Sequence, residues 1–253
     1  MRALHMLVSI LMVRLAGNHQ NKEASVSLLG LVLAENSYPG RGIICARTGD
    51  GNVVGGYFVT GRSEASRERE IRSTSTGELI VAAKGETGFD PLRHYVAATT
   101  SPQWLVFGNG AQVSTVAERL GQGVQPSVAL DDLENEPDDP IYTDRITAIM
   151  QRPLGQLAVM GAARRSLGAR STSNIITMTV RALEPGDAVL LTTYRSDGQV
   201  IEGGQPFIET SCAARNSAEL LDEIWASLNP DYRVAAMVLS VANELSDTLI
   251  RNA

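Results

Sequence analysis

Two glycine–arginine pairs in the first third of the sequence could form an anion site. They are Gly40-Arg41 and Gly61-Arg62, and Ser63 adds a hydroxyl next to the second pair. Arginine offers a planar fork of donors that fits a phosphate, and an adjacent glycine lets backbone N–H groups approach the same anion. The residues that follow alternate in charge, which is more typical of a solvated, salt-bridged surface. These alternating residues are Glu64, Arg67, Glu68, Arg69, Glu70 and Arg72.

A second candidate is the acidic segment 130–146, which has six carboxylates between Asp131 and Asp139. Its spacing lacks the glycine and the final glutamate of an EF-hand loop, so the sequence predicts no metal there. Residue types alone favour a solvated helix end and loop. The functional alternative makes one carboxylate a general base with Tyr142 and Arg145 as neighbours.

The Gly108-Asn109-Gly110 sequence is the third candidate. An asparagine amide can read a flat base edge, or it can simply occupy a left-handed turn position, and the turn is the more common role. None of the glycine clusters matches a phosphate-binding P-loop or a dinucleotide fingerprint. His94 is the single histidine beyond the N-terminal stretch, which weakens any Ser-His-Asp or zinc interpretation.

Composition limits the class of protein. The chain has 253 residues, 43% of them hydrophobic, and a formal net charge of −6. An acidic chain is a poor candidate for binding nucleic acid or an anionic membrane. Cys45 and Cys212 lie in apolar stretches, so we expect two reduced, buried thiols and a cytoplasmic protein. Residues 1–25 contain an apolar run too short to span a bilayer, and we expect a helical or disordered extension there.

Residues 26–253 are predicted to form one α+β domain that positions these candidates. Two β-rich runs around Gly49-Asp50-Gly51-Asn52 predict a hairpin. Many antiparallel-looking strands with helices on the sheet faces are typical of α+β proteins. The character of 26–34 is left open, because periodicity does not separate helix from strand there. Further strands are expected at about 78–83, 94–100, 104–107, 145–150, 156–163, 174–182, 188–194 and 206–211, and helices at about 114–120, 127–134, 216–229 and 234–250.

The four pieces YPGRGI, TGRSEASR, GNGAQ and EPDDPIYTDRI, in this order, resemble the archaeal-type IMP cyclohydrolases and their bacterial relatives. TYRSDG at 193–198 resembles a further bacterial-type segment. The match runs from about Tyr38 to Gly198, and the acidic segment is its most specific part. The resemblance implies a four-layer αββα fold like that of the N-terminal-nucleophile hydrolases, without their self-processing.

The resemblance also implies an activity that needs no cofactor: closure of 5-formamidoimidazole-4-carboxamide ribotide to IMP with loss of water. It assigns Glu136 as base or orienting group, with Tyr95 and Arg67 stabilising the oxyanion. The 5′-phosphate of the small-molecule nucleotide partner would be bound by Arg41, Arg62 and Ser63. Other contacts to the nucleotide would come from Asn109, Tyr142 and Arg145.

Two departures from the family pattern leave alternatives open. Ala111 stands where a polar residue is usual, and Asp144 stands where proline is usual. A relative that acts on another imidazole or pyrazole nucleotide, or one that only binds a nucleotide, would suit these changes. An N-terminal-nucleophile amidohydrolase would need a Cys, Ser or Thr as its first mature residue, whereas Cys45 lies inside a predicted strand. The oligomeric state stays open, a homo-oligomer included.

Overall fold

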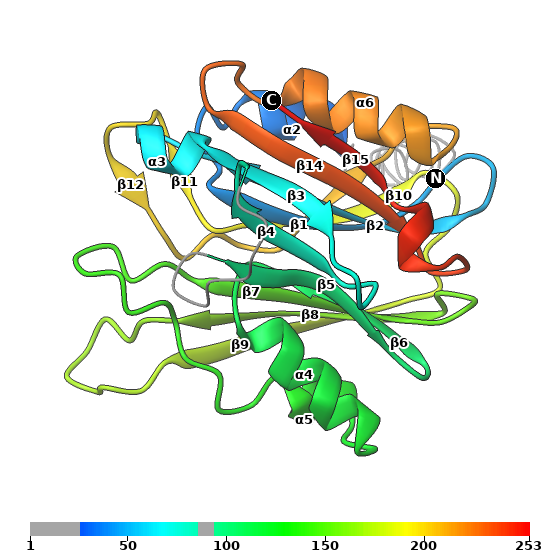
Figure 1. Ribbon diagram of the computed structural model, residues 1–253, viewed down its shortest axis with the longest axis horizontal. Helices are drawn as coiled ribbons and strands as arrows, with labels where there is room; N and C mark the ends of the chain where they lie inside the picture. Colours follow the sequence, from blue (N-terminus) through cyan, green and yellow to red (C-terminus); the bar gives the residue numbers. More distant parts are fainter. Residues whose placement is uncertain (1–25, 86–93) are drawn as a thin grey trace, which may run out of the picture.

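A computed structural model describes residues 26–85 and 94–253 of the chain. It contains two large antiparallel sheets packed face to face, with helices on the outer face of each (Figure 1). The α+β prediction is therefore confirmed. The predicted extension, residues 1–25, lies outside the described residues.

The first sheet has six strands in the order β13-β10-β1-β2-β14-β15. Its centre is the predicted hairpin, in which Arg41 pairs with Val59 and Gly51 adopts a φ of 86° in the turn. Glycine accepts this left-handed conformation without steric cost. The strands are β1 (Arg41–Arg47), β2 (Val53–Thr60), β10 (Asp187–Thr192), β13 (Ile208–Ser211), β14 (Arg233–Ser240) and β15 (Leu249–Asn252).

The second sheet has seven strands in sequence order, β3 to β9, each paired antiparallel with the next. A separate two-stranded sheet consists of β11 (Arg195–Ser196) and β12 (Ile201–Glu202), which pair antiparallel. The seven strands are β3 (Arg69–Ser73), β4 (Leu79–Ala83), β5 (Tyr95–Ser101), β6 (Trp104–Gly108), β7 (Arg145–Gln151), β8 (Leu157–Arg164) and β9 (Asn174–Arg181).

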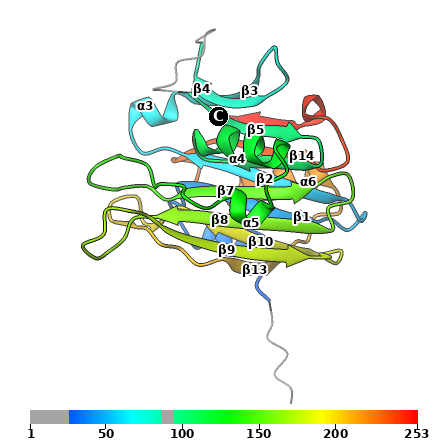
Figure 2. The ribbon, with the colours of Figure 1, turned by 90° about the horizontal axis from the view of Figure 1, so that it is seen from below.

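Helices cover the outer faces of both sheets. Helices α2 (Leu29–Ala34) and α6 (Ser217–Ser227) pack on the six-stranded sheet. Asn216 caps α6, and its Oδ1 accepts from the Glu219 N–H at 3.0 Å. Helices α4 (Gln112–Gly121) and α5 (Pro126–Ala129) lie across the seven-stranded sheet (Figure 2). The short α3 (Glu64–Arg67) and the 3-10 helix η1 (Leu245–Asp247) connect strands.

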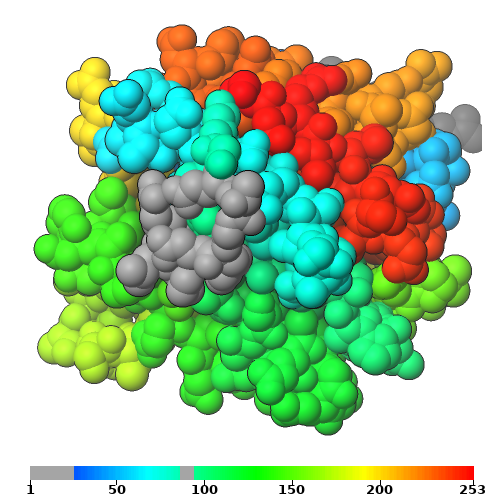
Figure 3. Space-filling model, in the orientation of Figure 1, coloured from blue at the N-terminus to red at the C-terminus, as the bar shows by residue number. Residues whose placement is uncertain are grey.

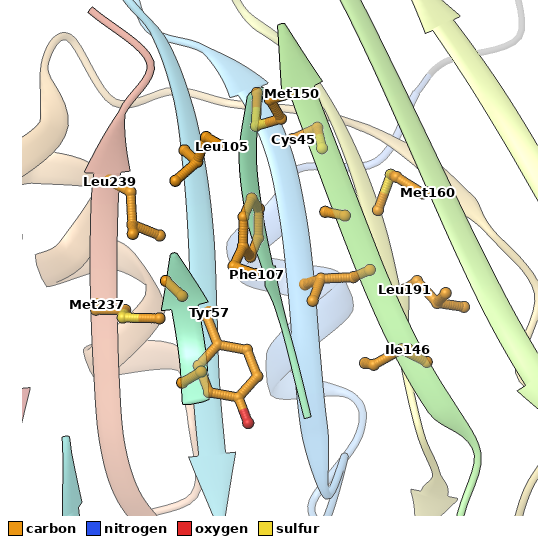
Figure 4. Close-up of a cluster of buried hydrophobic side chains, with 14 of the residues drawn as sticks. Cys45, Tyr57, Leu105, Phe107, Ile146, Met150, Met160, Leu191, Met237 and Leu239 are labelled. Carbon is orange, nitrogen blue, oxygen red and sulfur yellow. The ribbon is translucent and has the colours of Figure 1, made fainter. Parts of the chain in front are cut away.

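The main core fills the space between the two sheets (Figure 4). Side chains alternate along each strand, so one row of each strand faces this core and the other faces the helices. On β1, Ile43 and Cys45 face the inter-sheet core, while Ile44 and Ala46 face α6 and α2. Arg41 belongs to the same row as Ile43 and Cys45 and ends it. A cation is thereby placed at the end of an apolar interior.

The predicted C-terminal helix at 234–250 is wrong. The segment forms β14, then η1, then β15. Val234, Met237 and Val238 have helical spacing, but the residues between them are equally apolar, and the whole strand is buried on both faces. A short, continuously apolar run has no polar face, so its periodicity cannot separate a central strand from a buried helix.

The predicted helix at 127–134 is also mostly wrong, because α5 ends at Ala129. Asp132 adopts a φ of 60°, which breaks the helix and begins an irregular loop. The undecided segment 26–34 contains α2. Among the described helices, none combines the length and the apolar character that crossing a bilayer requires.

The two sheets are also joined at one edge by a side chain. The Asn252 Oδ1 atom accepts from the Ile71 N–H at 2.8 Å, and its Nδ2 donates to the Ile71 carbonyl at 3.1 Å. The carboxamide therefore bonds the outer edge of β3 as a neighbouring strand would.

Candidate active site

A cluster of polar side chains lies at the end of the inter-sheet core where β1, β5 and β7 begin. Tyr57 on β2 and Tyr95 at the start of β5 come from opposite sheets, and their hydroxyls are 2.7 Å apart. Tyr57 is fully buried, and its ring ends the row of core side chains in Figure 4. The two phenols join the sheets at the point where the apolar core gives way to charge.

Arg41 supplies the cation of this cluster. Its Nε atom is enclosed and finds no hydrogen-bond acceptor among the described residues. Burial opposes its charge, but Glu136 and the surrounding tyrosines outweigh that effect and raise the pKa of Arg41. A buried donor without a partner is costly in a folded protein. Such a donor is available to a bound molecule.

Glu136 supplies the carboxylate, from the acidic loop between α5 and β7. Its backbone N–H donates to the Thr143 carbonyl at 2.9 Å, which closes the loop on itself. Burial raises the pKa of Glu136, while the nearby charge of Arg41 acts to lower it. In the described part of the chain Arg41 and Glu136 form no ion pair, although each charge affects the other. A carboxyl group with a raised pKa beside a cation is suited to proton transfer.

Asn109 fixes the acidic loop to the seven-stranded sheet. Its Oδ1 accepts from the Ile146 N–H at 2.6 Å, and its Nδ2 donates to the Asp144 carbonyl at 2.9 Å and to Glu136 Oε1 at 3.4 Å. The side chain is completely buried. Asn109 thus lies next to Glu136, and its amide contacts the Glu136 carboxylate. Its role in binding a substrate remains a prediction.

We expect Asn109→Ala to destabilise the protein by about 2–3 kcal/mol, because the buried Ile146 N–H and Asp144 carbonyl lose their partner. Urea unfolding at neutral pH measures this loss. Asn109→Asp keeps the acceptor for Ile146 but places a second carboxylate beside Glu136. The exposed Gln122→Ala variant is the control and should unfold like the wild type. Equal midpoints for all variants would contradict the anchoring role.

A hydrogen-bonded chain connects the acidic loop to β10. Thr143 Oγ1 donates to Asp138, so the Tyr194 hydroxyl donates to Thr143 Oγ1. Burial raises the pKa of Tyr194 to about 12. Tyr194 also stacks on Tyr38, with ring centroids 6.1 Å apart. The phenol of Tyr194 therefore remains protonated near neutral pH.

Four other predicted site residues are Arg145, Arg62, Ser63 and Arg67. Arg145 begins β7, and its charge acts on Glu136. Arg62 lies over the ring of Tyr38, and its Nη1 donates to the Gly198 carbonyl at 3.1 Å. Ser63 caps α3 by accepting from the Ser66 N–H. Arg67 is exposed on α3. Their roles remain predictions.

Sequence reasoning missed Tyr57, Tyr194 and Arg69. Arg69 was expected to be solvated, yet it is half-buried at the start of β3 and its charge acts on Glu136. The signal available for Tyr57 was its alternation with Val59 in a buried strand, which puts both side chains on the inter-sheet face. Tyr194 lies within the quoted TYRSDG segment but carried no assigned role.

Cys45 is unsuited to act as a nucleophile. It lies in the middle of β1, is completely buried, and burial raises the pKa of its thiol to about 12. A reactive cysteine needs a stabilised, accessible thiolate. Within residues 26–85 and 94–253, no group of three or more His, Cys, Asp or Glu side chains is arranged to hold a metal ion. The absence of a metal from the reaction stays a prediction.

The fold and the cluster define an α+β protein with arginine, glutamate and tyrosine side chains gathered between two sheets. Residues 38–244 match the model of the IMP cyclohydrolase-like protein family, and the chain belongs to that family. An IMP cyclohydrolase from Methanopyrus kandleri is 32% identical over 95 residues, which are 37% of this chain and 46% of that protein. The chain thus aligns with about half the length of this curated relative.

Proposed function

We propose that the protein closes 5-formamidoimidazole-4-carboxamide ribotide to IMP with loss of water. The observation that carries the proposal is the half-buried set of opposite charges, Arg41 and Glu136, beside the Tyr57–Tyr95 hydroxyls in a chain of this family. Ring closure needs a base for the carboxamide proton, a stabilised oxyanion and a dry, ordered site. These residues offer all three.

The first step joins the carboxamide nitrogen to the formyl carbon. In the proposed mechanism Glu136 accepts a proton from the carboxamide as the new C–N bond forms. The formyl oxygen gains negative charge, which the guanidinium of Arg41 and the hydroxyl of Tyr95 stabilise. Preorganised donors of this kind are typically worth 10²–10³-fold in rate. The proton held by Glu136 then passes to that oxygen and gives a carbinolamine hydroxyl. The C–O bond breaks as this hydroxyl takes up a second proton and leaves as water, while the former formamide nitrogen loses its own proton and forms the C=N bond of the new ring.

We also propose that the helix–sheet–sheet–helix arrangement is related to that of the N-terminal-nucleophile hydrolases. The stacked antiparallel sheets with two outer helix layers support this relationship. The buried position of Cys45 fits a protein that does not use it as a first residue after processing.

The decisive experiment follows the purified chain as it converts the formylated ribotide to IMP, with both compounds quantified by chromatography. Loss of substrate with stoichiometric appearance of IMP supports the proposal. Binding of IMP without any turnover would instead favour a nucleotide-binding protein. Turnover of a different imidazole ribotide in preference to this one would favour the relative with a shifted substrate.

Arg67 is tested in the same assay. If Arg67 contacts the oxyanion as the family resemblance implies, Arg67→Ala should lower kcat by about 10²-fold. The side chain is exposed on α3, so the variant should fold normally. Arg215→Met removes another exposed arginine, which lies beside the β1–β2 turn at the opposite end of β1 from Arg41, and serves as the control. Unchanged turnover in Arg67→Ala would leave Arg41 as the arginine that acts at the reacting group.

A further inference from the structure

A cavity of about 540 Å³ opens next to the acid–base cluster. The acidic loop, the end of β8, the start of β9 and the segment around β12 form its walls. Figure 3 shows the green acidic loop and the yellow-green connection between β8 and β9 at the same edge of the molecule. Residues that line the cavity include Tyr142, Arg165, Asn174, Tyr194, Ile201 and Gly204.

One wall is held by a buried ion pair. Arg164 Nε lies 3.0 Å from Asp144 Oδ2, and the two side chains are only 12% and 7% exposed. The Gly204 N–H also donates to Asp144 Oδ2, at 3.1 Å, and Arg164 donates to the Gln205 carbonyl. Asp144, which departs from the family pattern, therefore fixes the 203–205 segment as a wall. Its charge is balanced by Arg164.

The remaining charge in the cavity is positive. Of the charged residues that line it, Asp144 and Arg164 cancel, and Arg165 is left. The Arg165 guanidinium lies 3.8 Å from the centroid of the Tyr142 ring, which orients it without using its N–H donors. Among the described residues it has no hydrogen-bond acceptor and no acidic partner within ion-pair distance. Its donors are thus available to an anion.

The backbone of Tyr142 is strained in a way that supports a binding role. Its φ is 52°, a left-handed conformation that a bulky side chain rarely adopts. This conformation places the ring beneath Arg165. Strain of this kind persists where the surrounding structure enforces it, often at ligand sites.

We propose that this cavity binds the 5′-phosphate end of the nucleotide, and that Arg165 contacts the phosphate. The inference rests on the proposed function, since the reacting ring would lie at Arg41 and Glu136. Tyr194 lines the cavity and its pKa is affected by both of those charges, so one molecule can extend from the cluster into the cavity. Of the three predicted phosphate ligands, Arg41 is instead proposed above to stabilise the oxyanion, and Ser63 caps α3. The third, Arg62, donates to a backbone carbonyl and covers Tyr38.

The test compares IMP with inosine, which lacks the phosphate, in calorimetric titrations in a phosphate-free buffer. The four proteins are the wild type, Arg165→Met, Arg62→Met and the control Arg215→Met. We expect Arg165→Met to weaken IMP binding by about 10- to 100-fold, since a charge-assisted contact to phosphate is lost, and to leave inosine binding unchanged. Arg62→Met and Arg215→Met should match the wild type for both compounds.

Three results would overturn the inference. They are equal IMP affinity in the wild type and Arg165→Met, an equal loss for IMP and inosine, and a phosphate-specific loss in Arg62→Met alone. The binding measurement is separate from turnover. A chain that binds IMP through Arg165 but makes no IMP would refute the proposed reaction and keep the site. Wild-type kcat and KM in the Arg165→Met variant would refute the phosphate site and leave the proposed reaction in place.

Discussion

Glu136→Gln is expected to reduce turnover of the formylated ribotide by about 10²–10⁴-fold, the range that a general base contributes. The amide has nearly the same shape and retains an oxygen for the Asn109 Nδ2 donor, so binding should change far less than kcat. The measurement is steady-state kinetics together with IMP titration. Asp131→Asn removes an exposed carboxylate of the same acidic segment and should keep full activity.

The pH dependence gives a second readout of Glu136. Burial raises the pKa of this carboxyl group, so the ionised form that accepts a proton needs a higher pH than it does in an ordinary glutamate. Activity should therefore rise with pH through that raised pKa and fall away on the acidic side. A kcat profile whose acidic limb is the same in the wild type and Glu136→Gln would exclude Glu136 as the base.

Gly108→Ala is expected to have the largest effect on stability, a loss of at least about 2–3 kcal/mol. A Cβ atom at this position would lie 2.2 Å from the Ile146 carbonyl oxygen on the neighbouring strand β7. The obstacle is backbone, so β6 and β7 must separate to accommodate it. Asn109 follows directly and bonds to Ile146, so activity should fall together with stability.

Gly121→Ala is the matched control for this variant. Gly121 ends α4, and no atom lies within 4 Å of a Cβ built there. Alanine favours helix over glycine by up to about 1 kcal/mol, so this variant should be as stable as the wild type or slightly more stable. Thermal and urea unfolding of both variants measure these changes in stability. A Gly108→Ala protein with the wild-type midpoint would show that the strands adjust without cost.

The sequence predicted most of the strands, because turn residues and short apolar runs are local signals. The hairpin with its turn at Asp50-Gly51 belongs to this group. The sequence-based prediction failed at β14, where the neighbouring strands decide the conformation. A run that is buried on both faces becomes a strand because β2 and β15 lie on either side of it. The pairing with β2, such as that of Arg233 with Thr60, joins residues far apart in the sequence and leaves no local signal in the run itself.

The candidate site was predictable only in part, for a related reason. Arg41, Tyr95, Asn109 and Glu136 were all named from the family resemblance, and the structure places them at one end of the core. Tyr57 was not named, because its importance comes from a hydroxyl contact with the opposite sheet. The pair of Asp144 with Arg164 depends on the register of β7 and β8, whose paired ends bring the two residues together. Contacts of both kinds follow from how strands and sheets are placed, which residue types do not encode singly.

The bond between Asn252 and Ile71 has a consequence for how copies of the chain can associate. An outermost strand exposes unpaired N–H and C=O groups, which invite another chain to add a strand and so begin aggregation. At the middle of β3 both backbone groups of Ile71 are already bonded to the Asn252 carboxamide. This border of the seven-stranded sheet is therefore closed to an incoming strand by a single side chain.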